Sequence, residues 1–271
     1  MFKNKKVLVT GSSGMIGREL VLQLKKLGAS VRTADIKEHW DLTNYGHCFN
    51  RCSQVDYVFH LAGIKGNPKM TQEQPLDFFE PMILFNTNMI KAARNSGVKK
   101  FLYTSSIAVE NMESDFYPAW AKLTGEHHVK ASGMDYIIAR PANVYGRYDD
   151  LSKEHLMVVS DLIKKARDEP FLEIWGDGST ERDFINSKDC ARGMIEAMTN
   201  LNNQTINLCS GIAVKIRDVA EFIAKQYKKK IVFDKTKPTG AKRRVMDLDW
   251  DFKPEIDIFK GIKEIIECKR K

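Results

Sequence analysis

Short apolar runs alternate with longer amphipathic segments through the first half of the chain. The runs have the length of buried strands, and their lack of polar alternation is typical of a parallel sheet covered on both faces. In the first amphipathic segment Ile16, Leu20 and Leu24 recur at helical spacing, which leaves one apolar stripe for the sheet. The expected strands are 7–10, 31–34, 57–62, 101–105 and 136–140, and the expected helices are 17–27, 83–96 and 120–131. This βαβ order predicts an α/β fold with a doubly wound parallel sheet.

The pattern changes after Gly146, where a polar loop opens a region of shorter strands. Because strands near the end return to the earlier order, we expect the second region to be interleaved with the first rather than joined to it as a separate domain. A first domain would span 1–147 with returning elements near 180–210, and a smaller C-terminal α/β substrate-binding region would span 148–271. The expected elements after 147 are helices at 155–167, 189–201, 216–227 and 256–268, and strands at 171–175, 206–208 and 231–233.

Composition limits the classes of protein to consider. The 271 residues are 43% hydrophobic and 29% charged, which excludes a disordered chain. The net charge of +8 arises almost entirely in residues 225–271, which hold 15 basic and 8 acidic side chains. Aromatic and basic residues are not interleaved there as a single-strand platform requires, so we expect no nucleic-acid partner.

The cysteines and the amino terminus indicate a cytoplasmic protein. The five cysteines are an odd number without a zinc pattern, so we expect reduced thiols and no metal. Adjacent His127 and His128 point in different directions on a helix and make a poor metal pair. The amino terminus lacks a signal-peptide pattern, and no apolar run approaches the roughly 18 residues of a membrane span.

A glycine-rich turn follows the first expected strand and opens the first expected helix. Gly11 permits a tight turn, Gly14 lets backbone amides approach a pyrophosphate, and Gly17 allows close helix–strand packing. The spacing and the context together predict a dinucleotide site on a Rossmann-type sheet.

Asp35 ends the second expected strand, where a carboxylate can accept hydrogen bonds from an adenosine ribose. It would repel a 2′-phosphate, so NAD is favoured over NADP, although Arg32 and Lys37 could approach such a phosphate. Asp41 and Leu42 offer a polar atom and an apolar floor to an adenine. The alternative for Asp35 is an ordinary turn or helix cap.

Six segments, taken together, resemble the extended short-chain dehydrogenase/reductases, the NAD-dependent nucleotide-sugar epimerases and dehydratases. They occur in family order: Gly11–Gly17, Asp56–Gly63, Thr104–Ser106, Lys122–Glu126, Arg140–Gly146 and Arg182–Phe184. The resemblance implies transient hydride transfer at a carbon of a nucleotide-diphosphate sugar. It also implies a homodimer formed through the helices at 83–96 and 120–131.

The resemblance assigns the site residues. Ser106 would hold the substrate oxygen, Tyr117 would act as acid and base, and Lys122 would lower the phenol pKa and hold the nicotinamide ribose. The substrate would contact Ser106, Asn143, Arg182 and Arg243. The cofactor would contact Gly11, Ser13, Gly14, Met15, Ile16, Gly17, Asp35, Ile36, Asp41, Leu42, Leu61, Ala62, Gly63, Lys65, Thr104, Lys122, Pro141 and Val144.

Two positions depart from the family pattern. The family tyrosine lies four residues before the lysine, where this chain has Pro118; Tyr117 lies five before, roughly 100° off that helical face. Pro118 favours a first helical turn, so we expect Tyr117 just outside the helix, where a loop could aim it inward. Met82 stands where the family often has an asparagine. A different acid/base, or a dinucleotide-binding sensor or scaffold without turnover, is the alternative.

Overall fold

The computed structural model divides into two compact units. The chain leaves the first unit after residue 141 and returns to it for most of one helix and for one strand. The first unit comprises residues 1–141 and 190–208, and the second comprises 142–189 and 209–271. The structure describes residues 1–64, 73–110, 117–152, 156–237 and 241–270. The division into a cofactor domain at 1–147 and a substrate region at 148–271 stays a prediction.

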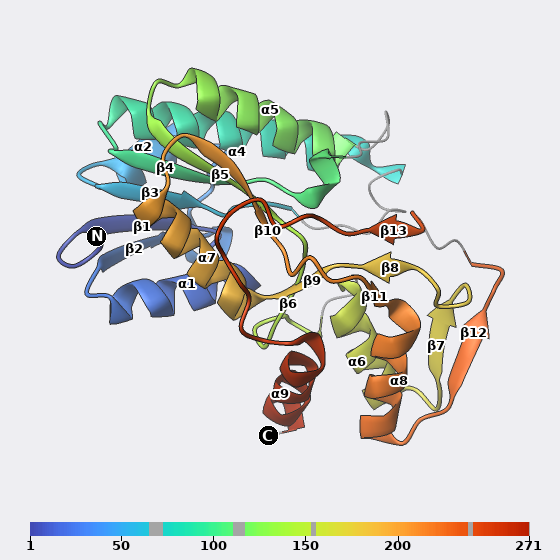
Figure 1. Ribbon diagram of the computed structural model, residues 1–271. Helices are drawn as coiled ribbons and strands as arrows, with labels where there is room; N and C mark the ends of the chain where they lie inside the picture. Colours follow the sequence, from blue (N-terminus) through green and yellow to red (C-terminus); the bar gives the residue numbers. More distant parts are fainter. Residues whose placement is uncertain (65–72, 111–116, 153–155, 238–240, 271) are drawn as a thin grey trace. The chain divides into compact units, whose positions relative to one another are not determined.

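A parallel sheet of six strands, counted over the described residues, forms the centre of the first unit (Figure 1). Its order is β10-β5-β4-β3-β1-β2, and every pairing is parallel. The strands are β1 (Lys6–Thr10), β2 (Ser30–Ala34), β3 (Tyr57–His60), β4 (Lys100–Thr104), β5 (Asp135–Pro141) and β10 (Gln204–Leu208). The chain winds outward in opposite directions from β1 and β3, so a ligand crevice is expected at the carboxyl ends of these two strands.

Helices cover both faces of this sheet, which confirms the predicted doubly wound fold. Figure 1 shows α2, α4 and α5 on one face and α1 and α7 on the other. Leu8, Val58 and Phe101 pack beneath α2, α4 and α5 in a continuous apolar core. The helices are α1 (Met15–Lys26), α2 (Tyr45–Cys52), α4 (Pro75–Asn95), α5 (Tyr117–Ala131) and α7 (Ser187–Asn200), with 3₁₀ turns η1 (Ile36–Glu38) and η2 (Ile107–Val109).

The second unit packs helices against several small sheets. Its core of aliphatic side chains includes Ile174, Val219 and Ile262. The strands pair as β6 with β9, β7 with β12, and β8 between β11 and β13. Their bounds are β6 (Asn143–Tyr145), β7 (Leu172–Trp175), β8 (Glu181–Arg182), β9 (Phe184–Asn186), β11 (Val214–Lys215), β12 (Ile231–Asp234) and β13 (Arg243–Arg244), and the helices are α6 (Val158–Asp168), α8 (Ile216–Tyr227) and α9 (Ile258–Arg270).

Helices α4 and α5 begin at least three residues earlier than the apolar pattern predicts. Helix α4 begins at Pro75, whose fixed φ and missing amide suit a first turn, and it continues through Pro81. Helix α5 begins at Tyr117 itself, so the expectation that Tyr117 lies just outside the helix is wrong. Pro118 occupies the second helical position, where its lack of an amide hydrogen breaks no helical hydrogen bond.

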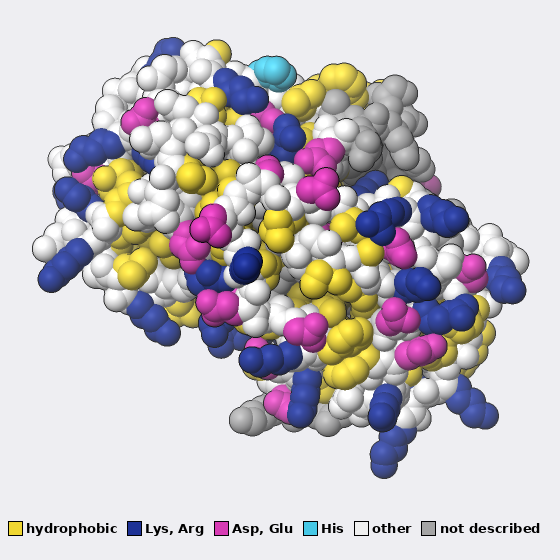
Figure 2. All heavy atoms as spheres, in the orientation of Figure 1, with side chains coloured by type: hydrophobic (Ala, Val, Ile, Leu, Met, Phe, Trp, Pro, Cys, Tyr) yellow, Lys and Arg dark blue, Asp and Glu magenta, His cyan; other side chains and the backbone are white. Residues whose placement is uncertain are grey.

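Three further features concern membrane-spanning helices, cysteines and surface charge. No helix among the described residues is long and apolar enough to cross a bilayer. All five cysteines are free thiols, and Cys268 is the exposed one. Lys and Arg side chains are interspersed with Asp and Glu on the face shown in Figure 2.

Candidate active site

The turn after β1 brings three glycines into very close packing. Gly11 has a φ of +63°, and a Cβ there would lie 2.9 Å from the backbone of Leu61 and Ala62. A Cβ at Gly17 would overlap the carbonyl oxygen of Gly11, and one at Gly14 would lie 3.1 Å from that oxygen. The glycines therefore bring α1, β1 and the loop after β3 together as only glycine allows.

The amino end of α1 suits an anion. Gly14 caps the helix without a side-chain hydrogen bond, and no acidic residue lies in the first turn. The amides of Met15, Ile16 and Gly17 belong to that turn, where the helix dipole favours negative charge.

Two buried hydroxyls at this edge of the sheet lack hydrogen-bond partners among the described residues. They are Ser12 Oγ, in the glycine turn, and Thr104 Oγ1, at the end of β4. Buried hydroxyls normally find a partner, so both fit a site that a polar ligand completes. With the glycine packing and the uncapped helix, they fit a bound dinucleotide.

Asp35 caps the turn after β2, which is the alternative expected for it, while its role toward an adenosine ribose stays a prediction. One carboxylate oxygen accepts from the Ser13 amide at 2.9 Å, and the other accepts from the Lys37 amide at 3.0 Å and caps η1. The carboxylate thus lies beside the glycine turn. Ile36 next to it is 67% exposed, as an apolar contact surface for an adenine would be.

The other two predicted adenine contacts, Asp41 and Leu42, already make contacts within the protein. Asp41 Oδ1 accepts from the amide and hydroxyl of Thr43 at 2.9 and 2.7 Å, and these bonds lower the Asp41 pKa. Leu42 is buried in the core beneath α2 and α4. An adenine floor at Leu42 is therefore a less suitable assignment than Ile36.

Arg32 is bound to the carboxyl end of α2. Its Nη1 donates to the carbonyl oxygens of residues 50, 51 and 53 at the carboxyl end of α2, at 3.4, 3.1 and 2.8 Å. A guanidinium held in this way satisfies three carbonyls of a helix end. The expectation that Arg32 could approach a 2′-phosphate is therefore not supported by its contacts.

Lys122 joins the carboxyl ends of β3 and β4. Its Nζ donates to the Thr104 carbonyl oxygen at 2.7 Å and would lie 3.6 Å from a Cβ at Gly63. Leu61 and Ala62, which precede Gly63, donate their amides to Thr10 Oγ1 at 3.1 and 3.2 Å. Of the predicted contacts in this loop, Lys65 lies outside the described residues.

The environment of Lys122 favours a readily exchanged proton. Burial lowers the pKa of the Lys122 amine to about 8, while the carboxylate of Glu126, one turn later, opposes that shift. An amine that titrates near neutral pH can orient a ligand as an ammonium group and still take part in proton transfer.

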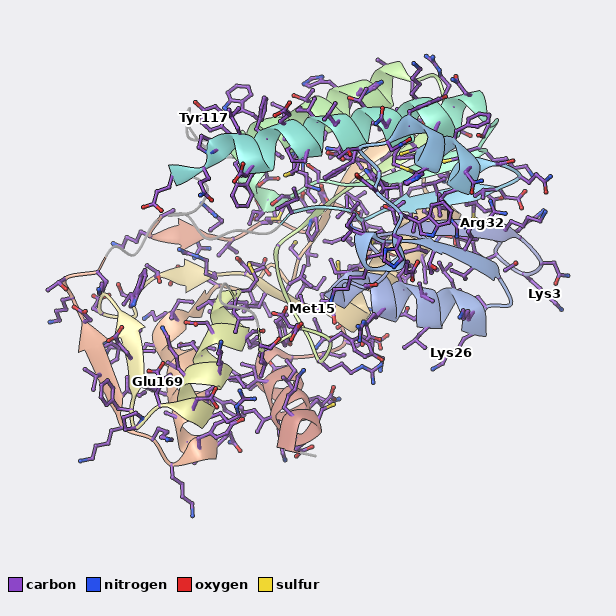
Figure 3. All side chains as sticks on the ribbon, turned by 180° about the vertical axis from the view of Figure 1, so that it is seen from behind. Lys3, Met15, Lys26, Arg32, Tyr117 and Glu169 are labelled. Atoms are coloured by element: carbon purple, nitrogen blue, oxygen red, sulfur yellow. The ribbon has the colours of Figure 1, made fainter. Side chains whose placement is uncertain are left out.

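The other two predicted catalytic residues differ in their settings. Ser106 lies two residues after the end of β4, and its Oγ accepts from the Ala108 amide at 3.1 Å, so it caps η2. Tyr117 lies in the first turn of α5 (Figure 3), is 41% exposed and packs edge-on against Phe79 of α4 at 5.9 Å between ring centres. The phenol therefore belongs to the α4–α5 pair.

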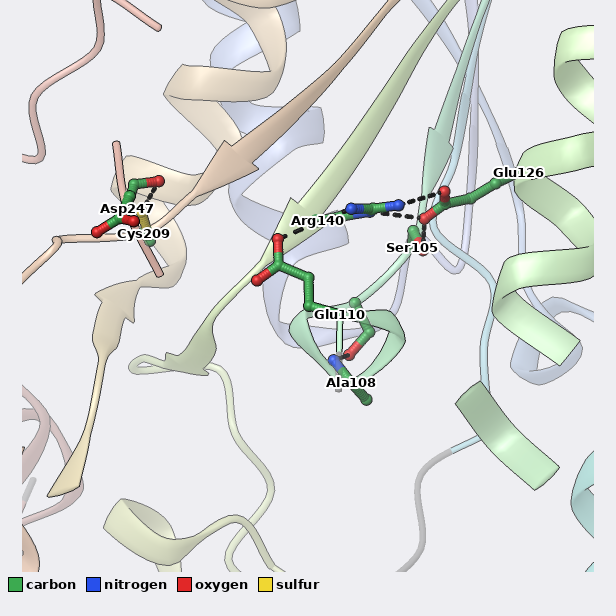
Figure 4. A network of polar contacts seen from close by, with 8 residues as sticks. Ser105, Ala108, Glu110, Glu126, Arg140, Cys209 and Asp247 are labelled. Carbon is green, nitrogen blue, oxygen red and sulfur yellow. Dashed lines mark hydrogen bonds and ion pairs between the residues drawn. The ribbon is translucent and has the colours of Figure 1, made fainter. Parts of the chain in front are cut away.

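A buried ion pair ties α5 to the sheet behind these residues (Figure 4). Arg140 of β5 donates to both oxygens of Glu126, from Nε at 2.9 Å and from Nη2 at 2.7 Å. Ser105 Oγ donates to Glu126 Oε1 at 2.5 Å. The ion pair thus links α5, β4 and β5 next to Ser106.

Three of the four predicted substrate residues, Asn143, Arg182 and Arg243, lie in the second unit. Asn143 donates from its amide side chain to the Asp183 carbonyl oxygen at 2.8 Å, and Val144 follows it in β6. Pro141, a predicted cofactor contact, is the last residue of β5 in the first unit.

The strands β8 and β13 place arginines side by side. Arg244 lies opposite Arg182. Burial lowers the pKa of Arg182, and the positive charge of Arg244 lowers it further. Arg243 instead pairs with Glu181 at 2.5 Å and is 59% exposed. Among the described residues no ion pair joins Arg182 or Arg244 to a carboxylate, and two adjacent cations suit an anionic ligand, so Arg244 is a further candidate beside Arg243.

Other important residues also escaped sequence reasoning. His60, Asn86 and Tyr103 form a buried polar cluster in the first unit. Polar side chains within an otherwise apolar helix or strand were the signal that could have found them. Among the described residues, no group of three or more His, Cys, Asp or Glu side chains could hold a metal ion.

The chain is similar to known proteins over most of its length. Residues 7–209 match the sequence model of the NAD dependent epimerase/dehydratase family. GDP-L-fucose synthase of Escherichia coli is 27% identical over 285 residues, which cover 90% of this chain and 88% of that protein.

Two solved structures show the same fold. A UDP-glucose 4-epimerase of Thermotoga maritima, solved with UDP-glucose, superposes with a TM-score of 0.86 at 22% identity, covering 98% of both chains. A GDP-mannoheptose C4 reductase of Campylobacter jejuni, solved with NADP, superposes with a TM-score of 0.85 at 23% identity and covers all of both chains.

Proposed function

This chain belongs to the NAD-dependent epimerase/dehydratase family, and we propose that it is an enzyme that epimerises, dehydrates or reduces a nucleotide-diphosphate sugar. The observation that carries this proposal is the Lys122 amine, held between Thr104 and Gly63 at the carboxyl edge of the sheet. The relatives described above are named for enzymatic activities. They give no support to a binding protein without turnover.

A bound nicotinamide dinucleotide would supply reversible hydride transfer at a sugar carbon. The Lys122 ammonium would orient the nicotinamide ribose by donating hydrogen bonds to it. Ser106 would hold the substrate oxygen by a hydrogen bond. Tyr117, at the first turn of α5, is the proposed acid and base, and Thr104 would use its unpartnered hydroxyl to bind the cofactor.

NAD is the proposed cofactor, because two side chains near the adenosine side favour it. Asp35 presents a carboxylate beside Ser13, which would repel a 2′-phosphate, and Arg32 is already bound to the end of α2. A protein of the same fold was solved with NADP, so the fold alone does not exclude NADP, and the preference for NAD is proposed from these two side chains.

The proposed substrate contacts in the second unit are Asn143, Arg182 and Arg243, with Arg244 added from the pairing of β8 and β13. Arginine forks bind phosphate oxygens bidentately, which suits a sugar nucleotide diphosphate. Similar proteins act on GDP sugars or UDP-glucose, so the base stays open.

Two further properties are proposed on separate grounds. The free thiols fit a reducing compartment, so we propose a cytoplasmic location. Exposed Leu84 of α4 and Trp120 of α5, at 44% and 41%, support a homodimer through these helices.

The test loads the protein with NAD or NADP and adds UDP-, GDP- and dTDP-sugars in turn. Absorbance near 340 nm follows cofactor reduction, and chromatography detects new sugar nucleotides. We expect tighter binding of NAD, turnover of one sugar class, and a loss of at least about 100-fold in kcat for Tyr117→Phe. Tyr57→Phe, at the opposite end of the sheet, is the matched control. Tight NAD binding with no turnover of any sugar would refute the proposal.

A further inference from the structure

Four side chains of the first unit form a continuous chain of hydrogen bonds that ends at Lys122. Thr10 Oγ1 lies 2.7 Å from His60 Nδ1, and His60 Nε2 lies 3.0 Å from Asn86 Oδ1. Asn86 Nδ2 lies 3.0 Å from the Tyr103 phenol oxygen, which lies 3.3 Å from the Lys122 carbonyl oxygen. The chain thus passes through β1, β3, α4, β4 and α5.

The donors and acceptors fix the direction of this chain. Thr10 Oγ1 already accepts the amides of Leu61 and Ala62, so its own hydrogen is donated to His60 Nδ1. His60 therefore carries its proton on Nε2 and donates it to Asn86 Oδ1. The Asn86 amide then donates to Tyr103, whose hydroxyl donates to the carbonyl oxygen of Lys122. In this assignment every hydrogen bond of the chain has one donor and one acceptor.

Burial makes the chain a rigid, neutral structure rather than a route for protons. His60, Asn86 and Tyr103 are at most 2% exposed. Burial lowers the pKa of His60 to about 3 and raises the pKa of Tyr103 well above its usual value. Neither ring therefore gains or loses a proton near neutral pH.

The far end of the chain lies under the proposed catalytic lysine. The Tyr103 ring lies 5.5 Å from Lys122 Nζ, and its hydroxyl holds the carbonyl of the same residue. Gly125, one turn from Lys122, has no room for a Cβ because the Tyr103 phenol occupies that space. Tyr103 thus contacts α5 at the backbone, at the amine and at the glycine.

Helix α4 contributes to this chain from an unexpected position. Met82, which stands where relatives were expected to have an asparagine, is buried in the apolar core. Asn86, one turn later, makes the polar connection between β3 and β4.

We propose that Asn86 and Tyr103 are positioning residues that hold Lys122 in register with the loop after β3, where Leu61 and Ala62 are tied to Thr10. The catalytic role of Lys122 rests on the proposed function, whereas the geometry of the chain does not. The expected effect is on the placement of the amine relative to a bound dinucleotide.

The first test needs no ligand. In protein labelled with ¹⁵N-histidine, the His60 signal is identified by its loss in His60→Gln, and its ring shifts are followed from pH 7 to pH 5. We expect the Nε2–H tautomer throughout. A proton on Nδ1, or a charged ring at pH 7, would overturn the direction of the chain.

The second test compares two buried tyrosines that make the same bond. Tyr103→Phe removes the donor to Lys122, and Tyr145→Phe removes a phenol that donates to the Asp257 carbonyl oxygen, also at 3.3 Å, in the second unit. Calorimetry measures the NAD Kd, and steady-state kinetics separates kcat from KM. We expect Tyr103→Phe to weaken NAD binding about fivefold and lower kcat about tenfold, with KM for the sugar nucleotide unchanged.

Asn86→Leu is expected to reproduce the Tyr103→Phe pattern, and Tyr145→Phe is expected to show neither change. Equal NAD affinities and equal kcat values for the two phenylalanine variants would overturn the positioning role. If the wild-type protein binds NAD but turns over no sugar, the proposed function fails. The NAD affinities and the histidine spectra then still decide the positioning role.

Discussion

Each unit buries a tyrosine against a glycine of a helix, and the two tyrosines differ in what lies behind the phenol. In the first unit Tyr103 fills the space beside Gly125 and donates to the carbonyl oxygen of Lys122. In the second unit Tyr145 fills the space beside Gly261 and donates to the carbonyl oxygen of Asp257. Both phenols are buried, and burial raises the pKa of each.

The two tyrosines differ in whether the helix that they hold carries a proposed catalytic residue. Tyr145 ties the start of α9 to β6, which holds two elements of one core together. Tyr103 does the same for β4 and α5, but α5 carries Lys122, and Asn86 connects the phenol to His60. The same packing device is therefore structural in one unit and, in our proposal, part of the active site in the other.

Ion pairs extend this comparison and give the largest expected effect. Arg140→Met would leave the Glu126 carboxylate, 1% exposed, without its cation. Removing one partner of a buried pair costs about 3–5 kcal/mol. Hydrogen exchange read peptide by peptide would show this loss in the first unit.

Arg243→Met is the matched change in the second unit. Its pair with Glu181 is 59% and 29% exposed on the two sides, and such pairs contribute less than about 1 kcal/mol. Similar losses for the two variants would show that Glu126 is not held as a buried charge.

The two helical glycines give a smaller effect that tests the packing itself. A methyl group at Gly125 or Gly261 would overlap the phenol of Tyr103 or Tyr145, so each alanine variant should lose about 1–3 kcal/mol of stability. The expected difference is functional, because Gly125→Ala would also displace Lys122 and weaken NAD binding.

Gly97→Ser is a useful control for these alanine variants, although for a different reason. Nothing lies within 4 Å of a Cβ at Gly97, but its φ is +68°, so a change there strains the backbone without overlapping a side chain. Equal effects on NAD affinity at positions 97 and 125 would show that general destabilisation, rather than displacement of Tyr103, is responsible.

Much of the fold could be predicted because its signals are local. The apolar runs and the three glycines act over a few residues, and the six-stranded sheet and α1 follow them closely. The strands β8, β11 and β13 are two residues long, which is too short for any periodicity. They exist because tertiary contacts pair them.

A site residue could be predicted only where its position in a sequence motif determines where it lies in the fold. Gly11 and Asp35 were assigned from spacing and context, and Lys122 from the family resemblance; the structure brings Lys122 to Thr104 and Gly63. In the basic segment 237–244 the sequence favoured Arg243, whereas a strand pairing, which spacing does not encode, puts Arg244 opposite Arg182. Asn86 was missed because its partners come from β3 and β4, far away in the sequence.

The smallest expected effect is a dependence of stability on pH that distinguishes the two units. His60 has a folded-state pKa of about 3, well below its ordinary value of 6.5. Between these values the unfolded chain binds a proton that the folded chain does not, so stability falls as the pH is lowered from 6.5 towards 3. From pH 7 to pH 5.5 this loss amounts to about 1 kcal/mol. His128, whose pKa burial also lowers, adds to it with the same sign.

The described residues of the second unit include no histidine, so they should contribute no such loss. Its carboxylates with lowered pKa values, such as Asp177 and Asp234, lose their contribution only below about pH 3.8. Hydrogen exchange at pH 7 and pH 5.5, corrected for intrinsic rates, measures each unit separately. In His60→Gln the loss of stability of the first unit between pH 7 and pH 5.5 should be only the part that His128 contributes. A wild-type first unit as stable at pH 5.5 as at pH 7 would mean that the His60 ring accepts a proton in place, and the chain from Thr10 to Lys122 would then not be neutral.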